Sequence, residues 1–110
     1  LLLGMLSGCS AREEKLRGIW EFKSSFSGTI RFMLLKDNTH FYKIQKLDQA
    51  AFTEKKGPWK LDGDKLTLSF DDGGSHGFEI TEMDDDRRMT VRDLAPGEGG
   101  LKGFQRVDKF

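Results

Sequence analysis

The chain has 110 residues, of which 36% are hydrophobic and 33% are charged. This length supplies one domain, and the single cysteine excludes an intramolecular disulfide. The 18 basic and 18 acidic residues give a formal net charge of zero, which argues against a nucleic-acid partner, because domains that bind phosphate backbones carry net positive charge or a basic face.

The first nine residues are an apolar run that ends at the only cysteine. Residues 1–6 are Leu-Leu-Leu-Gly-Met-Leu, and Ser7 and Gly8 separate them from Cys9. The run is too short for a membrane-spanning helix, which needs about 20 apolar residues, whereas an apolar segment followed by small residues is typical of the end of a secretory signal. The alternative is an N-terminal strand or helix with a buried cysteine, since a free cysteine commonly behaves as a small buried hydrophobe.

The sequence Leu6-Ser7-Gly8-Cys9 resembles the lipobox of bacterial lipoproteins. The resemblance implies cleavage before Cys9, which then carries a diacylglyceryl group and usually an N-acyl chain such as palmitate. Each buried CH₂ contributes about 0.8 kcal/mol, so several such chains would tether the protein permanently to membrane lipid. The implied location is the cell envelope, lipid-anchored, and the outer membrane in a Gram-negative organism, because Ser10 rather than Asp follows the cysteine.

These features divide the chain into three parts. We expect residues 1–8 to be a truncated lipoprotein signal peptide, since no Met or basic segment precedes them, and residues 9–17 to be the lipidated cysteine and a linker. Residues 10–17 are mostly charged, which fits a solvated spacer, with one helical turn as the alternative. Residues 18–110 are expected to form the folded domain.

Apolar and polar residues alternate with a period of two through this domain, which predicts strands with one buried face. Eight strands are expected, at 19–23, 29–34, 41–44, 59–61, 65–70, 78–81, 89–92 and 104–106. Turn sequences separate several of them, at residues 37–38, 62–64, 71–74 and 84–86. Short strands in such a meander indicate an all-β sandwich or an up-and-down barrel, and eight of them close more naturally as a barrel without exposed edges. The alternation places Arg31 and Arg92 on the outer face.

Two tryptophan motifs resemble the lipocalin family. Gly18-Ile19-Trp20 is a G-x-W sequence at the start of the first strand, and Arg106 lies in the last strand, where lipocalins carry an arginine that packs across this tryptophan. A cation over an indole face contributes up to about 2 kcal/mol, so the resemblance implies structural roles for Gly18, Trp20 and Arg106. The segment 57–66 is similar to a hairpin of bacterial lipocalin-like domains. The resemblance predicts a small, eight-stranded, up-and-down, lipocalin-like β-barrel.

The expected interior of this barrel is aromatic. An eight-stranded barrel is just wide enough to be filled by side chains or to hold one small ligand, and both alternatives stay open here. The inward set is Trp20, Phe22, Phe32, Phe41, Trp59, Phe70, Phe78 and Phe104. In the ligand-binding alternative, the candidate lining of the cavity is Phe22, Phe32, Phe41, Trp59, Phe70 and Phe78. The loop 49–52 is either the lip of an open mouth or an ordinary turn over Phe52.

Nothing in the sequence indicates an enzyme, a cofactor or a dedicated metal site. His40 and His76 are the only histidines; they lack the spacing of metal-binding motifs, and we expect both to face solvent. Asp71, Asp72 and His76 form a turn cluster that could hold an adventitious cation, but the pattern of a calcium-binding loop does not follow it.

Two functions remain, and both are non-covalent. The first is a lipid-anchored carrier or sensor of a small hydrophobic ligand. The second is a filled barrel that docks another envelope protein as an inhibitor or assembly accessory. The stretch 84–88, Asp-Asp-Asp-Arg-Arg, is either a solvated turn or part of such a docking surface.

Overall fold

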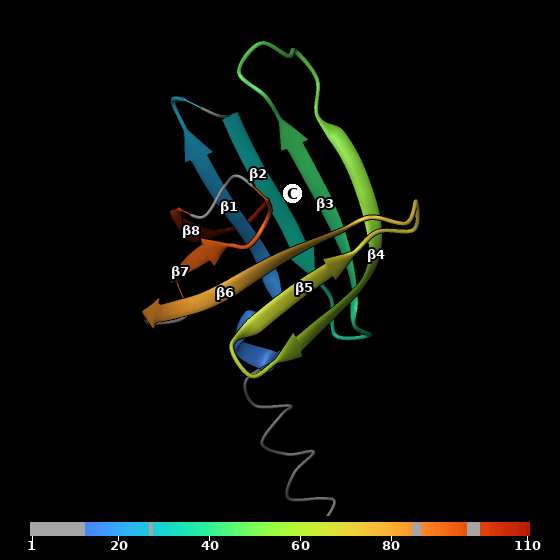
Figure 1. The fold of residues 1–110 in the computed structure, drawn as a ribbon, viewed down its shortest axis with the longest axis vertical. Coiled ribbons are helices and arrows are strands. Elements are labelled where there is room, and N and C mark those ends of the chain that lie inside the picture. Colours follow the sequence, from blue (N-terminus) through green and yellow to red (C-terminus); the bar gives the residue numbers. More distant parts are fainter. Residues whose placement is uncertain (1–12, 27, 85–86, 97–99) are drawn as a thin grey trace, which may run out of the picture.

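A computed structural model describes residues 13–26, 28–84, 87–96 and 100–110. Eight antiparallel strands follow one another around a closed barrel, and β8 returns to pair with β1 (Figure 1). The strands are β1 (Gly18–Ser24), β2 (Gly28–Leu34), β3 (Thr39–Gln45), β4 (Thr53–Asp62), β5 (Lys65–Ser69), β6 (Ser75–Asp84), β7 (Arg88–Asp93) and β8 (Leu101–Val107). The predicted eight-stranded up-and-down barrel is therefore confirmed.

Three turns that connect strands, at residues 37–38, 62–64 and 71–74, lie where the sequence predicts them. Asn38, Gly63 and Gly73 have φ angles of 65°, 62° and 103°, a region that Asn and Gly tolerate better than other residues. The predicted turn at 84–86 includes residues 85 and 86, which lie outside the described residues, as does Cys9. Among the residues that the structure describes, no helix is long and apolar enough to cross a membrane.

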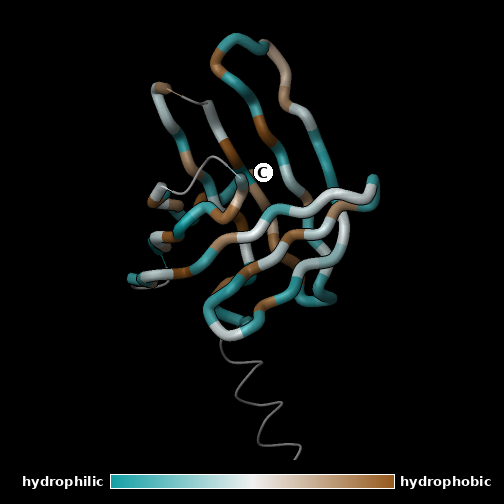
Figure 2. Tube along the Cα trace, in the orientation of Figure 1, coloured by the Kyte–Doolittle hydropathy of each residue, from teal (hydrophilic) through white to brown (hydrophobic). Residues whose placement is uncertain are grey.

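Apolar and polar residues alternate along the strands (Figure 2), and the apolar members of this alternation form the buried core. On β2, Ile30, Phe32 and Leu34 are buried, while the guanidinium of Arg31 lies outside and pairs with Glu21 of β1. Aromatic rings fill the middle of the barrel. The Phe32 ring lies 5.0 Å from the Phe104 ring and 5.9 Å from the Phe78 ring, measured between centroids.

A short helical turn closes one end of the barrel. Residues 13–16 form this turn, so part of the segment expected to be a linker packs on the barrel instead. The reason is Leu16, which is 1% exposed and whose carbonyl oxygen accepts a hydrogen bond of 2.8 Å from Trp20 Nε1. Arg106 joins the last strand to this turn. Its Cζ lies 4.3 Å from the centroid of the Trp20 ring, and its guanidinium donates hydrogen bonds to the carbonyls of Lys15 and Arg17.

Gly18 is required by this arrangement. Its φ is +123°, and a Cβ at this position would lie 2.3 Å from Arg106 Nη1. The chain direction at Gly18 therefore depends on having no side chain there, which explains why glycine precedes the buried Trp20 by two residues.

Strand β3 differs from the expectation by one residue. Its interior side chains are His40 and Tyr42, whereas Phe41 is 40% exposed, so the prediction that Phe41 faces the interior is wrong. The register explains the difference: Tyr42 lies opposite the buried Phe32, and Phe41 lies opposite the outward Met33. Directly opposed residues share one face of an antiparallel sheet, so Phe41 must point outward.

Candidate functional site

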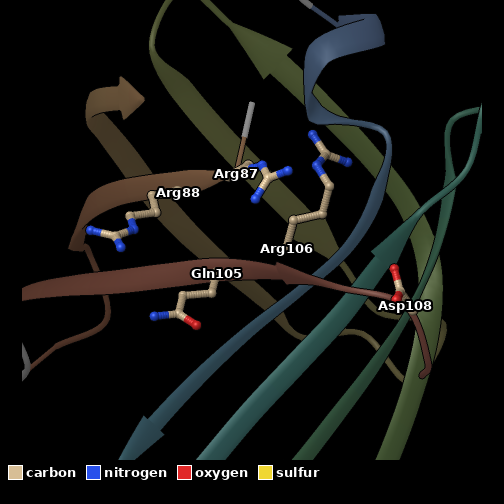
Figure 3. A pocket seen from close by; sticks show the side chains of 5 residues that line it. All are labelled: Arg87, Arg88, Gln105, Arg106 and Asp108. Atoms are coloured by element: carbon tan, nitrogen blue, oxygen red, sulfur yellow. The ribbon is translucent and has the colours of Figure 1, made fainter. Parts of the chain in front are cut away.

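Two hollows on the surface of the described residues are large enough to hold a small molecule. The first, at the closed end, has a volume of about 500 Å³ and is lined by Arg87, Arg88, Gln105, Arg106 and Asp108 (Figure 3). Arg87 and Arg88 are exposed to solvent, and the guanidinium of Arg106 packs over the Trp20 ring. This hollow is an open polar cleft without apolar walls, which is unlike the mostly apolar sites that bind small molecules.

The second hollow, which we call the mouth, lies at the open end of the barrel, opposite the helical turn. It has a volume of about 390 Å³, within the range of roughly 300–1,000 Å³ that is common for small-molecule sites. Inward residues of β2, β3 and β8 form its walls, and residues that follow β1 and β3 form its rim. The lining residues are Phe26, Gly28, Ile30, Ile44, Lys46, Leu47, Asp48 and Lys102.

A chain of polar side chains faces the interior beside the mouth. Lys102 Nζ lies 3.1 Å from Asp93 Oδ2, and His76 Nε2 lies 2.7 Å from Asp93 Oδ1. The other ring nitrogen of His76, Nδ1, lies 3.3 Å from the hydroxyl of Tyr42. The Ala95 N–H donates to Asp93 Oδ1 as well. Asp93 is only 1% exposed, so its carboxylate has these polar partners in place of the water molecules that would otherwise surround it.

The protonation states follow from this geometry. Burial acts to raise the pKa of Asp93, but the hydrogen bonds from the Ala95 N–H, His76 and Lys102 outweigh it and hold this pKa below its usual value. A carboxylate only accepts hydrogen bonds, so His76 Nε2 carries a proton and donates it. Burial, with a contribution from the Asp93 charge, raises the pKa of Tyr42 to about 12. The phenol therefore keeps its proton, and its hydroxyl oxygen lies within hydrogen-bond distance of His76 Nδ1.

Comparison with known proteins identifies the family of this chain. A sequence model of the Lipocalin-like domain matches residues 12–91. The chain belongs to the lipocalin-like domain family. A lipocalin-like protein from Bacteroides uniformis ATCC 8492 is 12% identical with a TM-score of 0.58, covering 84% of this chain and 99% of that one.

A second solved structure has the same barrel. It is an uncharacterized protein from Bacteroides eggerthii DSM 20697, 14% identical with a TM-score of 0.54, and the match covers 83% of this chain and 98% of that one. Identities this low show only the fold of a lipocalin-like domain. A search of curated proteins finds no match.

The six rings expected to line a cavity line neither of the two hollows of this lipocalin-like domain. Phe32, Phe78 and Trp59 are buried in its filled part, Phe22 and Phe70 pack against that part, and Phe41 faces outward. The loop 49–52, which was one candidate for the lip of an open mouth, does not line it either; Leu47 and Asp48 of the preceding residues do. Phe52 instead lies on the outer face, near Arg31 and Lys43.

The expectation that both histidines face solvent is also wrong. His40 is 1% exposed, its Nδ1 lies 3.2 Å from the Pro58 carbonyl oxygen, and burial lowers its pKa. His76 points to Asp93, while Asp72 pairs with Lys55, so the turn cluster expected around residues 71–76 does not assemble. No three His, Cys, Asp or Glu side chains in the described part of the chain could hold a metal ion together.

Sequence reasoning missed Asp93 and Lys102, although a signal was present. Asp93 follows Met89 and Val91 at the same spacing of two, and Lys102 precedes Phe104 by two. Continuing the alternation by one step would have placed both charges inside the barrel.

Proposed function

We propose that this protein binds a small hydrophobic ligand non-covalently in the mouth of its barrel, and that it does so without catalysing a reaction. The observation that supports the proposal is the hollow of about 390 Å³ at the open end of the barrel, beside the packed aromatic side chains of its core. Four of its lining side chains, Phe26, Ile30, Ile44 and Leu47, are apolar. An apolar ligand in this place would remove both its own surface and these side chains from water.

The filled part of the barrel limits how deeply a ligand can enter. The rings of Phe22 and Phe104 lie 5.7 Å apart, and those of Phe78 and Phe104 are also 5.7 Å apart. These separations are typical of aromatic side chains in direct contact. The ligand would therefore occupy the mouth and rest on this aromatic layer, without entering the barrel further.

The proposal includes a lipid anchor at Cys9, which places the barrel in the cell envelope. Cys9 precedes the first described residue by four positions, and four extended residues span at most about 14 Å. Residue 13 belongs to the turn at the closed end (Figure 1). An anchored barrel would thus hold its closed end near the lipid and turn its mouth away from it.

Ligand binding can be tested with the neutral apolar fluorophore N-phenyl-1-naphthylamine. We expect saturable binding to the wild type and its loss in Ile44→Trp, because the larger side chain would fill the mouth. Lys60→Trp adds the same side chain at an exposed position of β4 and should bind like the wild type. Equal binding by all three proteins, or no saturable binding by any, would contradict the proposal.

The anchor is tested separately by the intact mass of the mature protein from a membrane fraction. The expected mass is that of a chain beginning at Cys9 with diacylglyceryl and acyl groups, and Cys9→Ser should leave the protein unmodified. Residues retained before Cys9, or an unmodified thiol in the wild type, would remove the anchor from the proposal.

Docking to an envelope protein is the second candidate function. Apolar side chains are exposed at the open end, namely Phe26 (91%), Leu47 (59%), Leu94 (42%) and Leu101 (63%). Large exposed apolar side chains gathered at one place are typical of interaction sites. A photo-crosslinker at position 26 that captures one envelope protein, in a barrel that binds no apolar probe, would favour docking over ligand binding.

A further inference from the structure

A cluster of aromatic and cationic side chains lies on the outer surface of the barrel, on β2 and β3. Arg31 of β2 lies directly opposite Lys43 of β3, so the two cations share the outer face. The ring centroid of Phe52, in the connection that follows β3, lies 5.4 Å from Arg31 Cζ and 5.7 Å from Lys43 Nζ. None of these three residues lines either of the two hollows described above. The cluster is therefore a feature separate from the mouth.

Phe110 occupies this cluster. Its main-chain oxygen accepts hydrogen bonds of 3.0 Å from Arg31 Nη1 and 3.3 Å from Lys43 Nζ. The centroid of its ring lies 4.4 Å from Lys43 Nζ, a cation–π contact, and 6.3 Å from the centroid of the Phe41 ring. Side chains from two neighbouring strands thus hold both parts of one residue, its ring and its main-chain oxygen.

Phe110 reaches this place across two strands. It follows the end of β8 by three residues, and β1 and β2 lie between β8 and β3 in the barrel. Figure 1 marks this end of the chain beside β2 and β3. Asp108 and Lys109 are exposed, whereas Phe110 is half-buried. The aromatic residue is therefore the part of this segment, residues 108–110, that packs on the barrel.

The surface under this segment combines an apolar row with a fixed hydrogen-bond donor. The solvent-facing side of an antiparallel sheet is usually polar, but Ile19, Met33 and Phe41 lie opposite one another across β1, β2 and β3. Two positions along these strands, the carboxylate of Glu21 accepts from Nε and Nη2 of Arg31 at 2.8 Å and 2.5 Å. This pairing fixes the guanidinium and leaves its Nη1 for a second acceptor. Such a surface can recognise a ring and a nearby carbonyl oxygen together.

We propose that this face is a docking site for an aromatic residue of a partner protein, and that Phe110 is its resident occupant in the free protein. We call the site the outer cradle; it consists of Arg31, Phe41, Lys43 and Phe52. The partner presents an aromatic side chain to Lys43 and Phe41 and a main-chain oxygen to Arg31, as Phe110 does. A tethered occupant acts at an effective concentration in the millimolar range. Residues 108–110 therefore inhibit docking until a partner displaces them.

The test opens the outer cradle and supplies its occupant as a separate molecule. Phe110→Ala removes the ring from residues 108–110 and keeps the sequence of the barrel. The probe is the peptide acetyl-Val-Asp-Lys-Phe, which has the sequence of residues 107–110, and its binding is followed by shifts of backbone amide resonances in two-dimensional NMR spectra. We expect saturable shifts at residues 31, 41, 43 and 52 of Phe110→Ala. The wild type should need at least about a tenfold higher peptide concentration, because its own Phe110 competes.

Three controls assign the binding to the outer cradle. The peptide acetyl-Val-Asp-Lys-Ala lacks the ring and should not bind. Phe110→Ala/Lys43→Met lacks the cation that contacts both the ring and the oxygen, and should bind the first peptide at least about tenfold more weakly than Phe110→Ala. Phe110→Ala/Lys60→Met removes an exposed lysine of β4 instead and should bind like Phe110→Ala. The same spectra show that each variant is folded.

Several results would overturn the inference. They are no peptide binding to folded Phe110→Ala, equal binding by the wild type and Phe110→Ala, and binding that Lys43→Met does not weaken. In the wild type alone, nuclear Overhauser contacts are expected between the Phe110 ring and the Lys43 side chain, and their absence would overturn it as well. The proposed function is tested independently, because N-phenyl-1-naphthylamine probes the mouth and should bind Phe110→Ala as it binds the wild type.

Discussion

The contact between Gly18 and Arg106 makes a prediction that can be measured as a coupling energy. In Gly18→Ala the new Cβ would lie 2.3 Å from Arg106 Nη1, at a φ of +123°. Two separate effects follow. The backbone is strained by the side chain, and the guanidinium is displaced from the Trp20 ring and from the Arg17 carbonyl.

The magnitudes can be estimated for each effect. Backbone strain of this kind amounts to about 1–3 kcal/mol, and loss of the cation–π contact to about 1–2 kcal/mol. Arg106→Met removes the guanidinium without straining the backbone and should destabilise the protein by about 2–3 kcal/mol, including the lost charged hydrogen bonds. In the double variant there is no guanidinium for the new Cβ to displace. Only the backbone strain at position 18 is then added to the destabilisation caused by Arg106→Met. The destabilisation of the double variant should fall about 1–2 kcal/mol below the sum of the single variants.

Urea unfolding of the four proteins, followed by tryptophan fluorescence, measures this difference. The slopes of the unfolding transitions should agree, so that the midpoints report stability. If the two single effects add to within about 0.5 kcal/mol, the displacement of Arg106 by a side chain at position 18 does not occur and the reasoning is wrong.

Three further predictions concern the core. Phe32→Ala should destabilise the protein by about 3–5 kcal/mol as a buried ring truncation, while Phe41→Ala on the outer face should change the urea midpoint by the equivalent of less than about 1 kcal/mol; similar midpoints would contradict the register of β3. Trp20→Phe deprives the buried Leu16 carbonyl of its donor and should remove about 1–3 kcal/mol, seen as a lower Tm and as faster amide exchange in residues 13–17. Burial lowers the pKa of His40 from its usual 6.5 in the folded state, so the unfolded chain binds more protons and the stability should fall as the pH drops below about 6.5. His40→Asn should flatten this part of the plot of urea midpoint against pH. An unchanged slope would exclude His40 as its source.

The barrel could be predicted because local and global signals agree. Period-two alternation locates each strand, and positive φ at Asn38 and Gly63 occurs where the sequence has turn residues. The register of β3 was not predictable in the same way, because Thr39-His40-Phe41-Tyr42 offers an apolar ring on both faces. Only pairing with β2 decides between Phe41 and Tyr42, and pairing is a tertiary property.

The site was less predictable than the fold, for a physical reason. Counting aromatic residues identified most of the side chains that fill the barrel, with Phe41 as the exception, since large rings pack closely against one another. A hollow forms where the packing stops, at the ends of strands and in the loops that follow. Residues such as Phe26 and Leu47 line the mouth because of where their loops lie, and no periodicity in the sequence encodes that position.

Polar side chains interrupt the apolar interior of the barrel at two places, and they differ in how they are paired. His40, near the turn between β2 and β3, takes a backbone carbonyl as partner and remains a neutral part of the core. The other three, His76, Asp93 and Lys102, come from the adjacent strands β6, β7 and β8 and meet in one place beside the mouth. Apolar residues of similar size would be neutral or more favourable there for stability alone. Departures from the rules of folding concentrate at functional sites, so these three polar residues mark the open end of the barrel, beside the hollow, as the place where a functional site is expected.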